Sequence, residues 1–289
     1  MHAQDIASLP RRRGWLARQG WIVAFSFVII VLFLVVAVIA PWVAPYNFAD
    51  IDLIARTAPP VGFGGTWSHP FGTDDLGRDV LSRALISVRT SLTVALASSL
   101  VSVLIGVSLG LISARYRGLA GSVIRVAVDF NAALPFMILA LAVLAFFGNT
   151  LVLFVCLLGL YGWERYTRLV RAVAMSEYEK GYVFALRRIG ASEKRIALSH
   201  VLRNVLSVIV VNWTVTLPEV ILLESSLSFL GLGIQPPLAS LGNMVGMGRD
   251  YVVSAWWIAT IPGIAIFFLT FAVSVVGDWL RDYTDPSLR

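Results

Sequence analysis

The run WIVAFSFVIIVLFLVVAVIA, which occupies residues 21–40, contains no charged side chain. A helix that spans a membrane needs about 20 mostly apolar residues, because each residue adds about 1.5 Å of rise across a hydrocarbon layer of about 30 Å. The run meets both requirements. It is too long for the apolar part of a signal peptide, and Ala40 is followed by Pro41 without a cleavage pattern of small residues. We therefore predict an uncleaved first membrane span.

The chain as a whole has the composition of an integral membrane protein. Of its 289 residues, 58% are hydrophobic and only 14% are charged, and the mean hydropathy is +0.81. A soluble domain of this length needs far more polar surface to cover its core. Cys156, the single cysteine, lies in an apolar run, so we predict neither a disulfide framework nor a zinc site.

Five further segments are apolar and long enough to cross a membrane, so we predict an all-α membrane protein with six transmembrane helices. They are residues 90–114, 126–150, 151–172, 205–223 and 251–277. The connections then divide the chain in two. Residues 1–89 form an N-terminal tail, the first span and an extracytoplasmic segment, and residues 90–289 form the transmembrane core.

The placement of Lys and Arg predicts the orientation. With the N-terminus inside, 18 of the 23 basic residues fall on inner segments and inner helix ends, and five fall outside. Cytoplasmic loops retain Lys and Arg, so we expect both termini in the cytoplasm. This bias also explains the net charge of +6 without nucleic acid, which is not a predicted partner because no surface pattern of interleaved aromatic and basic residues is present.

The inner segment 173–204 contains a punctuated pair of short helices. Tyr182, Ala185, Leu186 and Ile189 have the spacing of one apolar helical stripe, and Leu198, Val201, Leu202 and Val205 repeat it before the next span. Gly190 provides a left-handed helix stop and Ser192 a helix N-cap. Such a pair suits docking into a groove on a partner. A solvated loop, or a basic helix lying on anionic lipid, is the alternative.

The same segment resembles the cytoplasmic loop motif of bacterial ABC-importer permeases, the motif that couples to the ATPase subunits. The family pattern is Glu-Ala-Ala, three residues, Gly, nine residues, then Ile-x-Leu-Pro. Gly190, Ala185 and Leu202 stand at matching positions. The departures are Phe184 for the glutamate, Leu186 for the second alanine, His200 for the isoleucine and Arg203 for the proline.

Other stretches are similar to the permeases of dipeptide, oligopeptide and nickel importers. They are HPFGTDDLGRDVLSR at 69–83, RLVR at 168–171, LSFLGLGIQPP at 227–237 and GDWLRD at 277–282, with Asp285-Pro286 after it. The matches come in family order and cover most of the chain from His69 onward. Leu241 stands where the family usually has tryptophan.

The resemblance implies a coupling element whose residues would contact an ATPase subunit. They are Phe184, Ala185, Leu186, Arg187, Arg188, Ile189, Gly190, Ala191, Ser192, Glu193, Lys194 and Arg195. The sequence has no phosphate-binding G-x-x-x-x-G-K-[ST] loop, so no cofactor is expected on this chain, and ATP and Mg²⁺ would bind to separate subunits.

The implied protein is a non-catalytic, multi-pass subunit of a bacterial inner-membrane importer. Its implied partners are a second homologous permease chain, two ATPase subunits, an extracytoplasmic substrate-binding protein and membrane lipid. It would form half of the translocation pathway for di- or oligopeptides. Nickel or metal chelates, glutathione and glycosides use the same scaffold and are alternative solutes.

Two other classes of protein fit less well. None of His2, His69 and His200 lies in a predicted span, which leaves a membrane-embedded hydrolase little to work with. An ATP-independent secondary transporter or channel would need inverted internal repeats or an intramembrane ion relay, and the sequence shows no such repeat.

Polar residues in and near the span 205–223 are candidates for the pathway lining. A carboxylate in hydrocarbon is costly, so it normally faces a cavity or a partner. The candidates are Asn212, Thr216, Glu219 and Glu224; helix–helix packing is the alternative. Outside the membrane, a metal site could draw on His69, Asp74, Asp75 and Asp79. Pairing of the acidic residues with Arg78 or Arg83 is the simpler interpretation, and no metal site is predicted.

Overall fold

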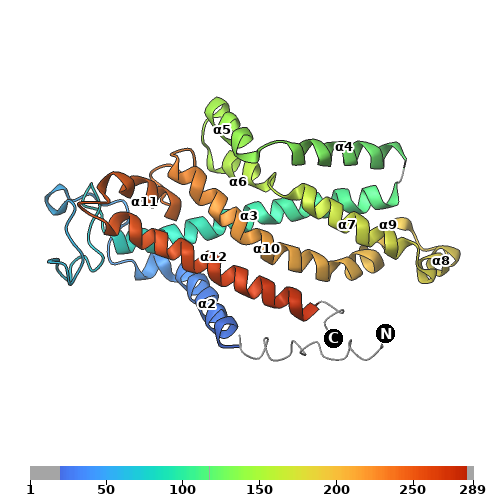
Figure 1. Ribbon diagram of the computed structural model, residues 1–289, viewed down its shortest axis with the longest axis horizontal. Coiled ribbons are helices and arrows are strands. Elements are labelled where there is room, and N and C mark those ends of the chain that lie inside the picture. Colours follow the sequence, from blue (N-terminus) through green and yellow to red (C-terminus); the bar gives the residue numbers. More distant parts are fainter. Residues whose placement is uncertain (1–19, 117, 285–289) are drawn as a thin grey trace, which may run out of the picture.

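A computed structural model describes residues 20–116 and 118–284. In these ranges the regular structure is helical, and the only β-type pairing is an isolated bridge between Thr73 and Asp79. Long helices run side by side along the long axis (Figure 1). The loop segment 44–79 and α11 (Leu241–Gly248) lie at one end, and α8 (Gly181–Arg188) lies at the opposite end.

Four helices are long and apolar enough to cross a membrane. They are α2 (Gly20–Val43), α3 (Val80–Arg115), the continuous helix Glu193–Phe229 whose main part is α10 (Leu202–Phe229), and α12 (Trp257–Thr284). They correspond to the first, second, fifth and sixth predicted spans. The chain is therefore a multi-pass membrane protein.

The third predicted span is bent and not straight. It consists of α4 (Leu119–Ala133) and α5 (Phe136–Phe147), whose axes differ by 88°. Pro135 causes the break, because proline disfavours helical geometry at the residue before it. Leu134 accordingly has an extended backbone, with φ −85° and ψ 131°.

The fourth predicted span is also interrupted. It consists of α6 (Leu151–Gly159) and α7 (Trp163–Tyr178), and Gly162 between them has a φ of 80°. The hydroxyl of Ser102 on α3 donates a 2.7 Å hydrogen bond to the carbonyl of Tyr161, which satisfies a backbone group that the break leaves free. Over residues 20–116 and 118–284 the structure therefore has four helices that could each cross a membrane, and a fifth crossing if α4 and α5 form one span; six spans are not confirmed.

Two small residues on α3 allow α7 to approach closely. A Cβ atom added at Gly106 would lie 2.5 Å from Cβ of Tyr166, and one added at Gly110 would lie 2.7 Å from Cβ of Val170. The sequence Gly-Val-Ser-Leu-Gly at 106–110 is the small-xxx-small pattern that lets membrane helices pack backbone to backbone. This contact holds α7 against α3, and α7 carries residues of both candidate sites described below.

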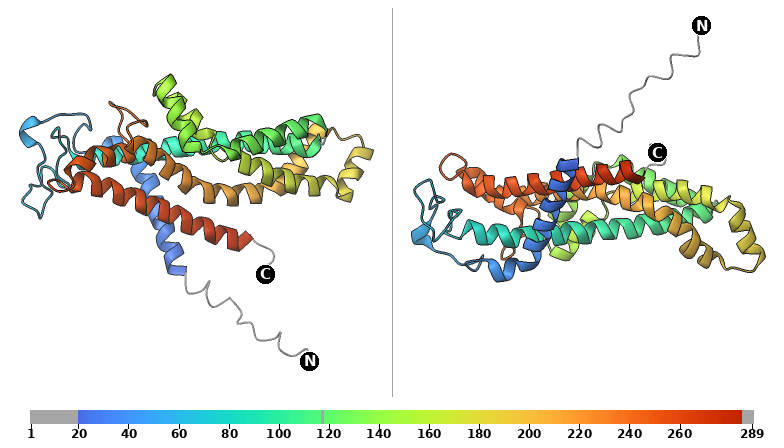
Figure 2. Two further views of the ribbon diagram at one scale, coloured as in Figure 1. Left: turned by 45° about the horizontal axis from the view of Figure 1, so that its top comes forward. Right: turned by 90° about the horizontal axis from the view of Figure 1, so that it is seen from below.

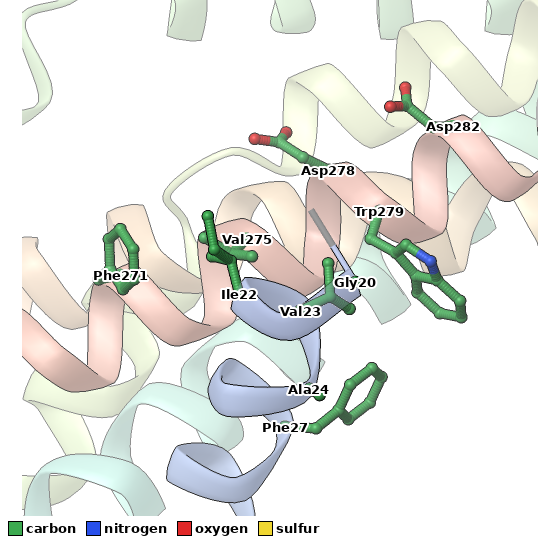
Figure 3. A pocket seen from close by; sticks show the side chains of 10 residues that line it. All are labelled: Gly20, Ile22, Val23, Ala24, Phe27, Phe271, Val275, Asp278, Trp279 and Asp282. Carbon is green, nitrogen blue, oxygen red and sulfur yellow. The ribbon is translucent and has the colours of Figure 1, made fainter. Parts of the chain in front are cut away.

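The first span crosses the other helices at a steep angle and lies on the outside of the bundle (Figure 2). Its contacts are with α3 and α12. Large apolar side chains such as Val28 and Leu32 are more than half exposed, as expected for a helix that faces lipid. Near its start, α2 and the end of α12 enclose a mostly apolar pocket, whose lining includes Phe27 and Asp278 (Figure 3).

Candidate functional sites

The first candidate site is the two-helix segment at the end of the bundle, residues 181–201, called here the helical tip. It consists of α8, the short α9 (Glu193–Arg195) and a π-helical turn, η2 (Ile196–Val201), that continues into α10. Gly190 has the left-handed φ of 84°, and the hydroxyl of Ser192 accepts a hydrogen bond from the Arg195 amide. The predicted joint, its glycine stop and its serine cap are confirmed.

The tip is fixed to the bundle by an apolar core. Val183 of α8 and Ile196 of η2 have no exposed surface, and they share one cluster with Leu111 of α3 and Val170 of α7. The π-helical turn, which has i→i+5 hydrogen bonds, allows Ile196 and Val201 to face the same core. Glu177 at the end of α7 adds polar contacts, accepting hydrogen bonds from Tyr182 and from Asn204.

The predicted apolar stripes are only partly correct. Tyr182 and Leu186 do pack against the core, but Ala185 and Ile189 are exposed. Val183, which the stripe did not include, is buried in that core. Ile189 is the C-cap of α8 and precedes Gly190, so its backbone has already left the helical face that the stripe assumed.

The second stripe differs for another reason. Val201 and Val205 are buried as predicted, whereas Leu198 is 51% exposed and Ile196 is buried in its place. The π-helical turn changes the side-chain period over these residues, so a pattern based on 3.6 residues per turn cannot place them.

Glu193 links the tip to the end of α3. Its carboxylate accepts a 2.7 Å hydrogen bond from Nε of Arg115 and a 2.8 Å bond from Nε of Arg187. The hydrogen bond from Arg187 and the one from Arg115 lower the pKa of the Glu193 carboxyl, because both stabilise its charged form. Arg187 and Glu193, two charged residues of the predicted coupling element, are thus paired with each other.

The outer surface of the tip is apolar and basic. Phe184 is 54% exposed and Ile189 79% exposed, and Arg188, Lys194 and Arg195 are exposed around them. On the side toward the bundle, Phe184 and Arg187 line a pocket together with Arg115 at the end of α3. An exposed apolar patch surrounded by charged residues is typical of a protein-binding surface.

The second candidate site is the polar part of α10, where two of the four predicted residues, Thr216 and Glu224, are buried. The hydroxyl of Tyr166 on α7 hydrogen-bonds with Thr216. Glu224 has no exposed surface and accepts a 2.8 Å hydrogen bond from Ser228. Thr216 and Glu224 are buried, whereas Asn212 and Glu219 are partly exposed, and a pathway role for the four residues stays a prediction.

Glu219 lies at a polar cluster that the sequence analysis did not assemble. Its carboxylate accepts hydrogen bonds from Nη1 of Arg165, at 3.0 Å, and from the hydroxyl of Tyr161, at 3.2 Å. Both partners come from the region where α6 ends and α7 begins. The signal in the sequence was the pair of charged residues, Glu164 and Arg165, shortly after Gly162.

The alternative metal site has no support in the geometry. Asp74 binds the guanidinium groups of Arg78 and Arg83, and Asp79 caps α3 while contacting His69 at 3.0 Å. Within residues 20–116 and 118–284, no three His, Cys, Asp or Glu side chains converge on a point that could hold an ion.

Comparison with known proteins identifies the family. Residues 106–289 match the family model for the binding-protein-dependent transport system inner membrane component. The chain belongs to this family of transport permeases. Residues 21–60 of the permease also match the model for the N-terminal transmembrane domain of oligopeptide transport permease C. The resemblance found in the sequence is thereby confirmed.

Three similar proteins carry the names of peptide transport permeases. The permease is 38% identical over 259 residues to the di/tripeptide transport system permease protein DppC of Pseudomonas aeruginosa, covering 89% of this chain and 86% of the relative. It is 39% identical to the dipeptide transport system permease protein DppC of Escherichia coli, with the same coverage. The dipeptide transport system permease protein DppC of Bacillus subtilis is 35% identical, covering 89% of this chain and 80% of the relative.

Proposed function

We propose that this permease forms half of the translocation pathway of an ATP-driven importer for di- or oligopeptides. The names of its relatives in Pseudomonas, Escherichia and Bacillus support peptides as the solute. The family description and the apolar helices support an inner membrane location. We further propose six crossings with both termini in the cytoplasm, α4–α5 and α6–α7 each making one crossing, and a division into residues 1–89 and 90–289.

The helical tip is the proposed contact with an ATPase subunit. Residues Phe184 to Arg195 would carry it, with Phe184 and Ile189 inserted into a groove and the exposed basic residues around them. One observation carries this proposal: the outer face of the helical tip has exposed apolar side chains, Phe184 and Ile189, while its inner face is buried against the bundle. Val183 and Ile196 fix the tip to α3 and α7, so a displacement of the tip would move the spans rigidly, as alternating access requires.

The remaining parts of the importer lie on other chains in this proposal. A second homologous permease chain would complete the pathway, two ATPase subunits of the same or different sequence would bind ATP and Mg²⁺, and an extracytoplasmic binding protein would deliver the solute. The permease itself would then be non-catalytic.

Cysteine crosslinking in the assembled complex tests the coupling role. In a Cys156→Ser background, Ile189→Cys should crosslink to an ATPase subunit. Val253→Cys is the matched control, because Val253 is fully exposed next to the outer end of α12 and should not reach the ATPase. Crosslinks from Ile189→Cys to lipid alone, or purification without any ATPase subunit, would favour an ATP-independent transporter or channel.

Uptake into proteoliposomes tests the solute. The complete complex with its binding protein should accumulate a labelled dipeptide only when ATP is supplied. Accumulation of a nickel chelate, glutathione or a glycoside in place of the peptide would retain the importer and reject the proposed solute.

A further inference from the structure

Glu219, which forms an ion pair with Arg165, lies within the fifth predicted span, residues 205–223. Glu219 is ten residues from the end of α10 at Phe229, which is about 15 Å at about 1.5 Å per residue. Charges at this depth normally face a water-filled cavity or a protein partner.

The pair is not sealed inside the chain. The side chain of Arg165 is 44% exposed and that of Glu219 is 37% exposed. A half-exposed ion pair gains little net free energy from its own contact, because water solvates both partners when they separate. A fully buried pair would be costly to open. The exposure of this one leaves both charged groups accessible from outside the chain.

The guanidinium retains capacity for a second carboxylate. Both of the hydrogen bonds that Arg165 makes to Glu219 come from Nη1. Arginine binds a carboxylate best through two parallel N–H groups. In the described part of the chain, the Nε and Nη2 groups of Arg165 are not used by Glu219.

The surroundings of the pair add a negative charge and neutral hydrogen-bonding groups. Glu164 precedes Arg165 in the chain and accepts a 3.0 Å hydrogen bond from Asn131 of α4, and Tyr161 donates to Glu219. Two carboxylates and one guanidinium give the cluster a net charge of −1. The residues come from α4, from the start of α7 with the break before it, and from α10, so the cluster joins three helices that alternating access would move.

From this arrangement we infer that the Arg165–Glu219 pair is a binding site for a zwitterionic solute, which it recognises by exchanging ion pairs. The solute's ammonium group would take the place of Arg165 on the Glu219 carboxylate, and its carboxylate would take the place of Glu219 on the Arg165 guanidinium. The excess negative charge favours the ammonium end. This inference rests on the proposed peptide transport and specifies which chemical groups of the peptide the permease contacts.

Direct binding to the assembled complex tests the inference. The complex is placed in nanodiscs without binding protein, and saturation-transfer NMR measures the dissociation constants of three probes: alanyl-alanine, its N-acetylated form and its C-terminal amide. The wild type should bind the uncapped dipeptide about tenfold more tightly than either capped form, the factor expected for a hydrogen bond to a charged group.

Two variants should each remove one preference. Glu219→Gln should make the uncapped and N-acetylated peptides bind equally, while the preference for a free carboxylate remains. Arg165→Gln should make the uncapped peptide and the C-terminal amide bind equally, while the preference for a free ammonium group remains. Asp278→Asn, which removes an exposed carboxylate from α12, should change neither. Each single variant leaves one charge of the pair without its partner. The double variant Arg165→Gln/Glu219→Gln leaves no unpaired charge, and it should lose both preferences.

Three results would overturn the inference: equal binding of all three peptides to the wild type, no binding at all, or variants that weaken all three peptides by the same factor. The last result would indicate that the pair only holds helices together. ATP-driven dipeptide uptake by the wild-type complex, measured separately, distinguishes each of these from failure of the proposed function.

Discussion

The carboxylate of Glu193 on the helical tip and the guanidinium of Arg115 at the end of α3 are joined by a 2.7 Å hydrogen bond. Arg187 contacts the same carboxylate from α8. The pair therefore connects the proposed ATPase contact to a helix that continues through the membrane. Because the pKa of Glu193 is lowered, its stabilising contribution is present at neutral pH and is lost only as the pH falls through that lowered value.

Replacing Glu193 with glutamine should loosen this connection. Half-exposed ion pairs contribute about 0.2–1 kcal/mol each, so we expect the solute moved per ATP hydrolysed to fall by about two- to fivefold while membrane insertion is unchanged. Asp282→Asn removes a carboxylate on α12, away from the tip, and is the control. A Glu193→Gln complex with the wild-type ratio of transport to hydrolysis would show that the pair has no part in coupling.

Gly190 should tolerate asparagine better than valine. No atom lies within 4 Å of a Cβ built at this position, so added volume is not the obstacle. The obstacle is the φ of 84°, which costs most residues about 1–2 kcal/mol and which asparagine adopts more readily. Uptake should be retained in Gly190→Asn and lost in Gly190→Val, with equal amounts of each protein in the membrane. Equal uptake by both variants would contradict the requirement for a left-handed joint.

The sequence predicts the joint between α8 and α9 but not the side-chain contacts around it, because the residues in contact are far apart in the sequence. Gly190 and Ser192 have local backbone preferences that hold in any context. Arg115 is 78 residues from Glu193 and Arg165 is 54 residues from Glu219 in the sequence, so no periodic pattern could pair them. The bend at Pro135 was visible in the sequence, but an apolar run alone does not distinguish a straight span from a bent one.

Substitution of Gly106 should destabilise the subunit by overpacking. A Cβ at this position would lie 2.5 Å from Cβ of Tyr166 and 2.6 Å from the carbonyl oxygen of Trp163. Since backbone cannot move aside easily, Gly106→Val should cost about 1–3 kcal/mol and lower the Tm of the purified permease. Gly263→Val in α12 is the matched control, because its Cβ would meet nothing within 4 Å. If both variants had the wild-type Tm, the close α3–α7 contact would not exist in the membrane.

Asp74 should be essential for the stability of the outer segment. Its carboxylate is 3% exposed and binds Arg78 at 2.7 Å as well as Arg83. Removing one partner of a buried ion pair leaves charge uncompensated and costs about 3–5 kcal/mol, so Asp74→Asn should lower the Tm strongly. Asp250→Asn breaks an exposed pair with Arg249 and should shift the Tm little. Treatment with EDTA distinguishes these ion pairs from a metal site at Asp74. EDTA should leave the Tm of the wild type unchanged. If Asp74 held a metal ion, EDTA would lower the Tm as the substitution does.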